Sequence, residues 1–376
     1  QADLDDWRGE RVQQSGIAKG RIKPSSAFDL ITVLNTNTLE DEPLWPGQKE
    51  MAQFAINGKQ TILGDRMGLG KTRAALAAVA IDAANQPGNV GRHLAIVSHA
   101  GLKDYWRREL DAMKHNGLVV SRFFDTITSI SWGKLSRVRE IDKDQPLTYV
   151  IVDEAHKAKN RNSQRSKILM KICNMKSIKL IVLATGSAIA DKPQDLWHLL
   201  HILDPKNYSS FWEFVRSHCE IDVVRYGQKE FHEIGRPINQ KRLGKRISNR
   251  LISRDYPKDA LPPKHEKFED IAISQEIKNI YKRIRKEPFV EVNGEIYATD
   301  TAIGKSHWGS TILGMDPNLT NRALELIDDN RGHTIIVFEH VLCAESFYDK
   351  LREQHPINDI YTGWSGHNQI HLFEEN

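Results

Sequence analysis

The chain has 376 residues, of which 40% are apolar and 27% charged, and a net charge of +4 at neutral pH. This composition excludes a wholly disordered chain, and 24 Gly and 14 Pro exclude collagen-like or low-complexity material. No apolar stretch approaches the ~20 residues of a membrane helix, the first residues are acidic, unlike a signal peptide, and three scattered cysteines offer neither a disulfide framework nor a zinc cluster. We therefore expect a soluble, reduced, intracellular globular protein with room for two cores.

The first half of the chain alternates between short apolar runs and helical patterns. Residues 1–42 lack this alternation and are interpreted as an N-terminal extension, whereas 43–205 are predicted to form an α/β lobe. Strands alternating with helices predict βαβ units and a parallel sheet. The expected strands are 61–63, 93–97, 149–152 and 180–183, and the expected helices are 74–84 and 102–113.

The second half of the chain changes in character. Strand-like runs become rare over 206–260, where aromatic and basic residues predict a helical protrusion or brace. Residues 261–376 are predicted to begin a second α/β lobe, with a helical insertion followed by a strand at 333–338. The residues from His333 to Asn376 are too few to complete a parallel sheet, so we expect this lobe to be truncated.

A glycine-rich segment between a strand-like run and an Ala-rich helical pattern predicts a phosphate-binding loop. Residues 64–72 are Gly-Asp-Arg-Met-Gly-Leu-Gly-Lys-Thr. In such a loop the backbone at Gly68 and Gly70 cradles the phosphates of ATP, Lys71 reaches the β- and γ-phosphates, and the Thr72 hydroxyl binds Mg²⁺. The alternative is an ordinary helix-capping turn, because aspartate replaces the first glycine of the general pattern.

An acidic motif follows the strand expected at 149–152. Asp153 ends this run, where an ATP-hydrolysing enzyme needs its Mg²⁺ ligand, and Glu154 can polarise the attacking water. His156 can sense the γ-phosphate. A solvated acidic turn is the alternative, and the order of this motif after the phosphate loop favours the catalytic interpretation.

Positive charge is concentrated in two stretches. Residues 157–179 carry eight Lys or Arg and no acid, and residues 241–286 carry fourteen Lys or Arg against six acids, so each has a net charge of +8. Such stretches suggest a track for a polyanion, and solvated helix faces are the alternative.

Together these motifs resemble the Swi/Snf-like family of superfamily two DNA translocases, over roughly residues 43–376. That family writes the loop as Asp-x-Met-Gly-Leu-Gly-Lys-Thr, which accounts for Asp65, and the acidic motif 153–160 matches its second motif. The sequence of 211–264 is most similar to the small annealing-helicase type. The other matching segments are 99–110, 184–188 with 196–205, 261–264, 335–338 and 361–366.

The resemblance implies two RecA-like lobes, ATP with Mg²⁺, and further site residues. Gln48, in Leu-Trp-Pro-Gly-Gln, would contact adenine, although Trp45 and Gly47 replace the usual Arg and Tyr. Thr185 and Ser187 would couple the nucleotide state to the grip on DNA. Family motifs five and six, which carry the arginine fingers, do not occur before Asn376, so we expect ATP binding but slow hydrolysis by these residues alone, unless another arginine such as Arg254 substitutes.

The resemblance also implies contacts with double-stranded DNA. Ser98, His99, Lys103 and the turn at Ser131-Trp132 would touch the tracking strand, with Trp132 equally acceptable as a core residue. The brace within 241–286 would contact phosphates without reading sequence. The residues expected to do so are Lys241, Arg242, Lys245 and Arg246.

The resulting hypothesis is an ATP-driven translocase on duplex DNA, including branched or partly single-stranded forms, that serves remodelling, annealing or repair. The alternatives are a catalytically silent regulator that binds nucleotide and DNA, and a helicase acting on RNA. A bacterial or viral protein in the cytoplasm is favoured, and a nuclear one if the source is eukaryotic.

Overall fold

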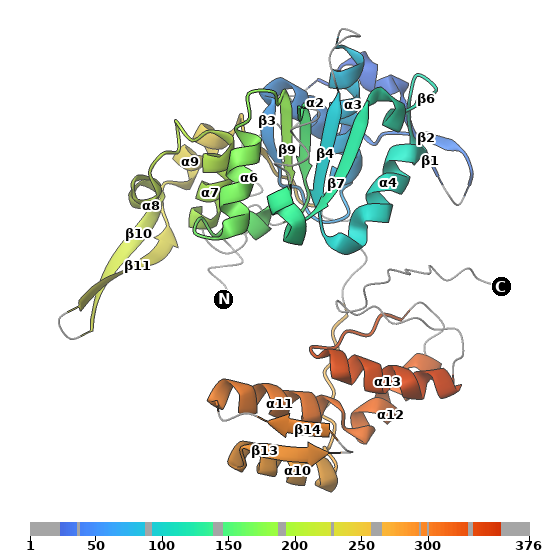
Figure 1. Cartoon of the computed structure of the whole chain (residues 1–376), viewed down its shortest axis with the longest axis vertical. Coiled ribbons are helices and arrows are strands. Elements are labelled where there is room, and N and C mark those ends of the chain that lie inside the picture. Colours follow the sequence, from blue (N-terminus) through green and yellow to red (C-terminus); the bar gives the residue numbers. More distant parts are fainter. Residues whose placement is uncertain are drawn as a thin grey trace. The chain divides into compact units, whose positions relative to one another are not determined.

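The computed structural model describes residues 23–35, 38–86, 92–137, 146–186, 193–226, 229–256, 265–292, 295–298, 301–329 and 334–354. The chain divides into two compact units, residues 1–262 and 263–376 (Figure 1).

The first unit is built on a six-stranded parallel sheet, as the alternating sequence pattern predicts. Strands β3, β9, β8 and β4 lie side by side in that order, with β12 beyond β3 and β7 beyond β4. All five pairings are parallel. The strands are β3 (Gln60–Leu63), β4 (His93–Ser98), β7 (Thr126–Ser131), β8 (Tyr149–Val152), β9 (Leu180–Ala184) and β12 (Leu251–Ile252).

Each face of this sheet carries its own hydrophobic core. Because side chains alternate along a strand, Tyr149 and Ile151 of β8 join one cluster, whereas Val150 and Val152 join the other. The first cluster is filled from α2 (Pro46–Gly58), α3 (Lys71–Ala84) and α4 (Lys103–Ala112). The second is filled from α6 (Gln164–Cys173), α7 (Pro193–Leu203), α8 (Phe211–His218) and α9 (Gln240–Ile247).

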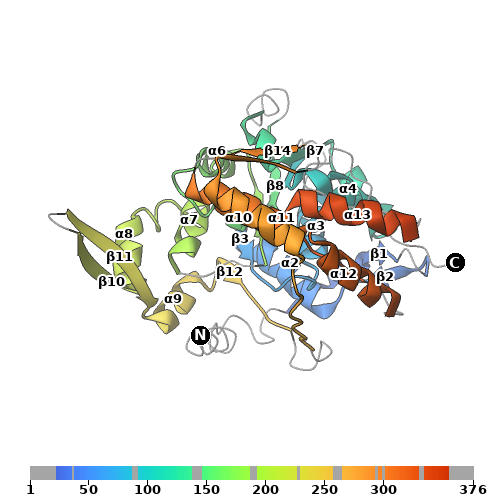
Figure 2. The same ribbon diagram turned by 90° about the horizontal axis from the view of Figure 1, so that it is seen from below.

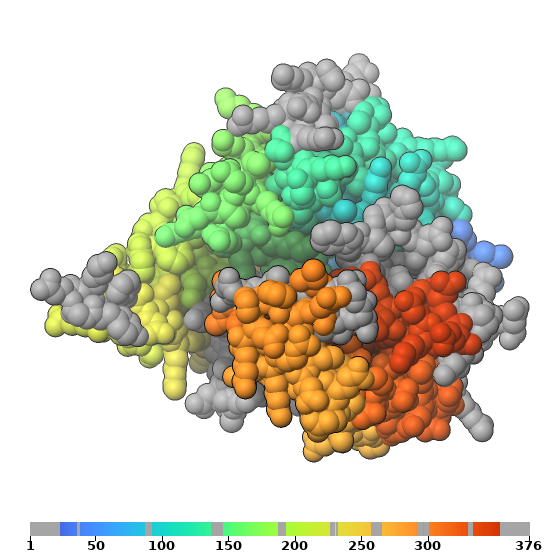
Figure 3. Space-filling model, turned by 60° about the horizontal axis from the view of Figure 1, so that its bottom comes forward, coloured from blue at the N-terminus to red at the C-terminus, as the bar shows by residue number. Residues whose placement is uncertain are grey.

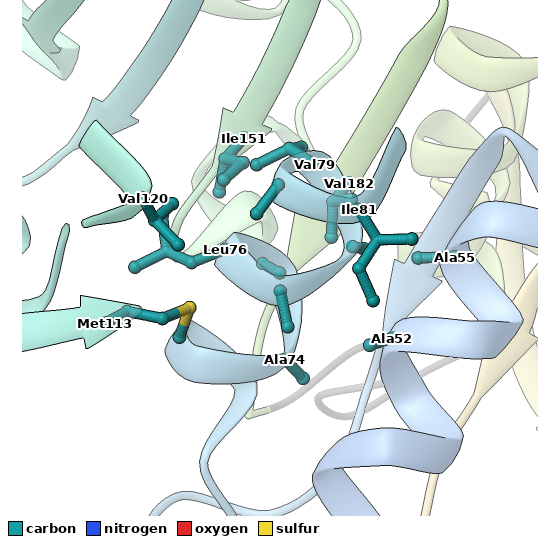
Figure 4. Close-up of a cluster of buried hydrophobic side chains, with 14 of the residues drawn as sticks. Ala52, Ala55, Ala74, Leu76, Val79, Ile81, Met113, Val120, Ile151 and Val182 are labelled. Carbon is teal, nitrogen blue, oxygen red and sulfur yellow. The ribbon is translucent and has the colours of Figure 1, made fainter. Parts of the chain in front are cut away.

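Helix α3 is the central helix of the first core. Its residues from Ala74 to Ala83 are all buried, and their small side chains let it approach both α2 and the sheet. Figure 4 shows Val79 of α3 beside Ile151 and Leu76 beside Val120, with Ala52 and Ala55 of α2 on the other side of the helix. The helix therefore holds the phosphate loop, which precedes it, against a rigid base.

The structure differs from the extension predicted for residues 1–42. Over the described part of this range, η1 (Ser26–Leu30), β1 (Ile31–Leu34) and β2 (Asp41–Pro43) belong to the first unit. Strand β1 pairs with β2 on one side and with β5 (Met113–His115) on the other, and β5 in turn pairs with β6 (Leu118–Val119), in a small antiparallel sheet. Burial of Phe28, Ile31 and Val33 in the first core explains why this segment is ordered.

The protrusion predicted to be helical over 206–260 contains an antiparallel hairpin. Helix α8 leads into β10 (Cys219–Tyr226) and β11 (Lys229–Pro237), and α9 follows. Val223 lies opposite His232 in this pairing, and the aromatic and basic composition of the segment had favoured a helix instead. The hairpin projects from the rest of the first unit (Figures 1 and 3).

The second unit is mostly helical where it is described. It consists of α10 (Gln275–Lys286), β13 (Phe289–Val292), β14 (Glu295–Ala298), α11 (Ala302–Gly314), α12 (Pro317–Asp329) and α13 (Val341–Gln354). Helices α10 and α11 pack side by side, with Ile277, Ile284 and Ile312 in their shared core (Figures 1 and 2).

The strand predicted at 333–338 is not formed over 334–338, and His333 lies outside the described residues. Ile335 and Val337 are 89% and 86% exposed, and no described strand pairs with this segment. An apolar run forms a strand only where a neighbouring strand accepts and donates its backbone hydrogen bonds. The prediction was wrong because no described strand pairs with this segment.

In the described part of the chain, no helix combines the length and apolar character needed to cross a membrane.

Candidate nucleotide site

Three strands bring the predicted motifs to one edge of the sheet. The phosphate loop follows β3, Thr185 follows β9 and Asp153 follows β8, and these strands are neighbours in the sheet. The carboxyl ends of parallel strands lie at the same edge. Segments far apart in the chain therefore meet above β3, β9 and β8.

The phosphate loop has the backbone conformation that its glycines permit. Gly68 and Gly70 have φ values of +80° and +77°, in the left-handed region, and Gly70 caps the start of α3. Lys71 Nζ donates to the carbonyl oxygens of Asp65 and Arg66, at 2.7 and 2.9 Å. Burial lowers the pKa of Lys71, and the charges of Asp65, Glu154 and Asp153 oppose this shift. The loop thus presents a helix N-terminus and one ammonium group to the same space.

Gly70 also leaves room for a neighbouring side chain, so Gly70→Ala is expected to distort the loop. An added Cβ would lie 2.1 Å from Nε2 of Gln48. Gly117→Ala is the matched control, since Gly117 has a φ of +76° and no atom within 4 Å of an added Cβ. In both variants alanine must adopt a left-handed backbone conformation, so the free energy of unfolding should fall by about 1–2 kcal/mol. Chemical denaturation measures this loss. Only Gly70→Ala should also weaken nucleotide binding, measured by calorimetry, and equal affinities in the two variants would contradict this account.

The acidic motif is held rigidly at the end of β8. The backbone N–H of Asp153 donates to the Val97 carbonyl at 2.7 Å, and Trp132 Nε1 donates to the Asp153 carbonyl at 3.1 Å. Glu154 has a φ of +49°, a conformation that costs energy for a residue with a side chain. Burial raises the pKa of Asp153, the charge of Glu154 raises it further, and Lys71 opposes the rise. A cation bound there would favour the ionised carboxylate.

His156 connects the acidic motif to the end of β9. Its Nδ1 lies 3.1 Å from Oε2 of Glu154 and 3.1 Å from the Thr185 hydroxyl. Thr185 is fully buried. Ser187, which is predicted to act with Thr185, lies outside the described residues. Glu154, His156 and Thr185 form a continuous polar link from the acidic motif towards the third predicted motif.

A cleft in the first unit collects most of the residues predicted to bind nucleotide. These residues are Gln48, Gly68, Gly70, Lys71, Thr72, Asp153 and Glu154. Gln48 is buried, and its Oε1 accepts a hydrogen bond from the Trp45 backbone N–H at 3.0 Å. Its side chain therefore caps α2 while its amide lies against Gly70.

Sequence reasoning did not assign five further residues that line this cleft. They are Trp45, Met67, Arg73, Tyr105 and Glu109. Arg73 Nε donates to Glu109 Oε2 at 2.9 Å, which ties α3 to α4 across the cleft. Burial raises the pKa of Tyr105, as does the charge of Glu109, whereas a hydrogen bond with Thr72 opposes the rise. Arg73 and Tyr105 lie in the first turns of α3 and α4, which begin next to the predicted motifs. This position could have pointed to them, but neither residue belongs to a motif itself.

The residues in the cleft fit a nucleotide with a divalent cation. The left-handed glycines form a cradle that a Cβ at Gly70 would fill, and Lys71 supplies a positive charge beside it. Thr72 and Asp153 offer the hydroxyl and carboxylate oxygens that Mg²⁺ prefers. The donor set therefore matches a phosphate–magnesium group.

The residues predicted to touch DNA beyond β4 differ in exposure. Ser98 is only 1% exposed, so its hydroxyl is not accessible to a DNA strand in this structure. His99 and Lys103 are exposed. Trp132 is 5% exposed and donates to the Asp153 carbonyl. It is therefore a core residue, the alternative considered for it above.

Helix α9 presents the four basic residues predicted for the brace. Leu243 and Ile247 are buried, whereas Lys241, Arg242, Lys245 and Arg246 are exposed. Arg246 donates to the Asn207 carbonyl at 2.8 Å and lies over the Tyr208 ring. The exposed positions are those expected of an amphipathic helix with one basic face.

The family model of the SNF2-related domain matches residues 45–322, most of the chain. The protein therefore belongs to the SNF2-related family, which confirms the resemblance seen in its motifs.

This chain is similar to one part of several longer proteins. A Caenorhabditis elegans homologue of SWI/SNF-related matrix-associated actin-dependent regulator of chromatin subfamily A-like protein 1 is 26% identical, over 70% of this chain and 38% of the relative. The Arabidopsis thaliana ISWI chromatin-remodeling complex ATPase CHR17 is 29% identical over 63% and 22%. The Bos taurus DNA annealing helicase and endonuclease ZRANB3 is 27% identical over 59% and 22%. The chain thus spans about a fifth to two fifths of these relatives.

A solved structure, the Sulfolobus solfataricus SWI2/SNF2 ATPase core in complex with dsDNA, is 18% identical. It aligns with a TM-score of 0.44 over 82% of this chain and 69% of that chain.

Proposed function

We propose that this protein is an ATP-driven motor that translocates on double-stranded DNA and serves remodelling, annealing or repair. One observation carries the proposal: a phosphate loop, an Asp–Glu pair and the link from Glu154 through His156 to Thr185 converge at one edge of the sheet. The relatives include proteins named as chromatin-remodeling ATPases and a DNA annealing helicase. Such a motor would work where DNA is, in the cytoplasm of a bacterial cell or the nucleus of a eukaryotic one.

The chain's own groups divide the chemistry between them. The N–H groups at the start of α3 and the Lys71 ammonium would bind the β- and γ-phosphates. Thr72 and Asp153 would hold Mg²⁺, which when bound neutralises phosphate charge. Glu154 would accept a proton from the attacking water, and its carboxylate lies 3.1 Å from Nδ1 of His156.

The link through His156 gives the site a route to respond to the nucleotide. Glu154 and Thr185 both contact the same ring nitrogen of His156, so a change at the γ-phosphate that moves Glu154 also alters the contact with Thr185. We propose that Thr185, together with Ser187, couples the nucleotide state to the grip on DNA.

The DNA side of the proposal rests on the basic face of α9, with His99 and Lys103 as further contacts. Lysine and arginine contacts to phosphate give affinity without reading sequence, which a motor stepping along any duplex requires. The exposed basic face of α6 is the other candidate surface, with Arg165, Lys167 and Lys171.

Two triple variants separate these surfaces. Replacing Lys241, Arg242 and Lys245 with alanine should weaken duplex binding and lower the slope of log affinity against log salt by about 0.9 for each phosphate that is no longer neutralised. The matched control replaces Arg165, Lys167 and Lys171, and it should leave the slope unchanged. Fluorescence anisotropy of a labelled duplex, titrated at several salt concentrations, measures both. A slope altered only by the α6 variant would move the DNA site away from α9.

A further inference from the structure

The segment from Leu251 to Tyr256 runs beside the phosphate loop. Strand β12 pairs with the end of β3, and the pairing continues beyond both strands. The Gly64 N–H donates to the Ile252 carbonyl at 2.7 Å, and the Arg66 N–H donates to the Arg254 carbonyl at 3.2 Å. The loop is therefore supported along its first residues by a segment that lies almost two hundred positions later in the chain.

Arg254 is the strongest of these supports. Its Nε and Nη2 lie 2.8 and 2.7 Å from Oδ2 of Asp65, and its backbone N–H donates to Oδ1 at 2.9 Å. Its Nη1 donates to Glu50 at 2.8 Å, and Nη2 also donates to the Gly47 carbonyl at 2.6 Å. One guanidinium therefore joins the loop to the start of α2.

The residues held in this way are those that hold Lys71. The side chain of Asp65 binds Arg254 while its carbonyl accepts from Lys71 Nζ, and the N–H of Arg66 binds Arg254 while its carbonyl also accepts from Lys71 Nζ. A single peptide unit thus separates Arg254 from the group that would contact phosphate.

Gly47 leaves room for the Arg254 guanidinium to lie close to the start of α2. A Cβ at position 47 would lie 3.3 Å from both Nη1 and Nη2 of Arg254. The planar fork of arginine suits this site, and a lysine would reach only one of its partners.

We propose that Arg254 is a positioning residue for nucleotide binding, acting through Asp65 to hold the phosphate loop in the shape that presents Lys71. The inference rests on the proposed function, because it presumes that the loop binds nucleotide. The guanidinium is already engaged by Asp65, Glu50 and Gly47, so the structure does not support the expectation that Arg254 could act as an arginine finger.

A purely structural role must be separated from positioning. Asp65 is fully buried, and burial raises the pKa of its carboxyl while Arg254 opposes the rise. Removing Arg254 alone would leave a buried carboxylate without its partner and could unfold the chain. The double variant Asp65→Asn with Arg254→Gln removes both charges and avoids this difficulty.

The experiment compares the double variant with Arg250→Gln. Arg250 lies just before the same segment and pairs with Asp204 at 3.1 Å, but it donates to the carbonyls of Gly58 and Gln60 at the other end of β3. The full chain of each variant is titrated with a fluorescent N-methylanthraniloyl-ADP in the presence of Mg²⁺. Thermal unfolding of the same samples reports stability.

We expect the double variant to remain folded at the temperature of the titration, with some loss of stability from the contacts with Glu50 and Gly47, and to bind the ADP probe about tenfold more weakly, because charged hydrogen bonds that order the loop are removed. Arg250→Gln should keep wild-type affinity. A double variant with wild-type affinity, or an equal loss in Arg250→Gln, would overturn the role of Arg254. A wild-type chain that does not bind the probe would instead overturn the proposed function.

Discussion

Lys71→Ala is expected to lose nucleotide binding. The Lys71 ammonium donates to two backbone carbonyls of the phosphate loop, and it would be the cation that meets the β- and γ-phosphates. Hydrogen bonds between charged groups are worth more than neutral ones, so removing the ammonium from two phosphates should weaken affinity by roughly 10²-fold or more. Calorimetry with ATP and Mg²⁺ measures the change.

The control for this variant is Lys114→Ala. Lys114 pairs with Asp41 at 2.8 Å in the small antiparallel sheet and does not line the cleft, so its replacement also removes one positive charge and one ion pair. Affinity for ATP should stay at the wild-type value. Unchanged affinity in Lys71→Ala would show that the loop does not bind phosphate.

Glu154→Gln is expected to separate binding from hydrolysis. The amide keeps the shape of the side chain and can still contact His156, but it cannot accept the proton of the attacking water. ATP affinity should therefore persist while turnover falls by about 10²–10⁴-fold. Calorimetry and steady-state phosphate release on the same sample give the two quantities.

Asp153→Asn provides the comparison for Glu154→Gln. Asp153 would hold Mg²⁺, so its replacement should weaken the binding of ATP with Mg²⁺ as well as turnover. If both variants lost affinity to the same degree, the division of roles between the two carboxylates would be wrong.

The main sheet could be predicted because its strands are both apolar and regularly separated by helices. The runs at 93–97 and 149–152 lie within β4 and β8, and the glycine-rich loop and the acidic motif meet where parallel strands end. The α/β class and the family were therefore accessible from the sequence, and the residue roles in the cleft stay predictions.

Other elements were hidden because their residues are polar or few. Strand β7, Thr-Ile-Thr-Ser-Ile-Ser, lies at the sheet edge and tolerates hydroxyl side chains, and β12 has only two residues. The hairpin β10–β11 mixes charged and apolar residues on a projecting surface. None of these carries the apolar run that made the central strands visible.

The Asp65–Arg254 pair could not be predicted for a different reason. The two residues lie 189 positions apart and belong to segments that the sequence pattern did not place together. The aspartate at the first position of the loop looked like a departure from the phosphate-loop pattern, and the family spelling accounted for it without a physical cause. The structure supplies one, since its carboxylate binds Arg254, two residues beyond β12, and Arg254 in turn contacts Glu50 of α2.

The affinity for duplex DNA in different nucleotide states tests the central claim most directly. A motor must hold DNA differently before and after hydrolysis, so the coupling free energy between the two sites cannot be zero. We predict that the affinity for a labelled duplex differs by about fivefold or more between the states bound to ADP and to a non-hydrolysable ATP analogue, and that Thr185→Ala reduces this difference. Equal duplex affinity with ADP, with the ATP analogue and without nucleotide would contradict the account.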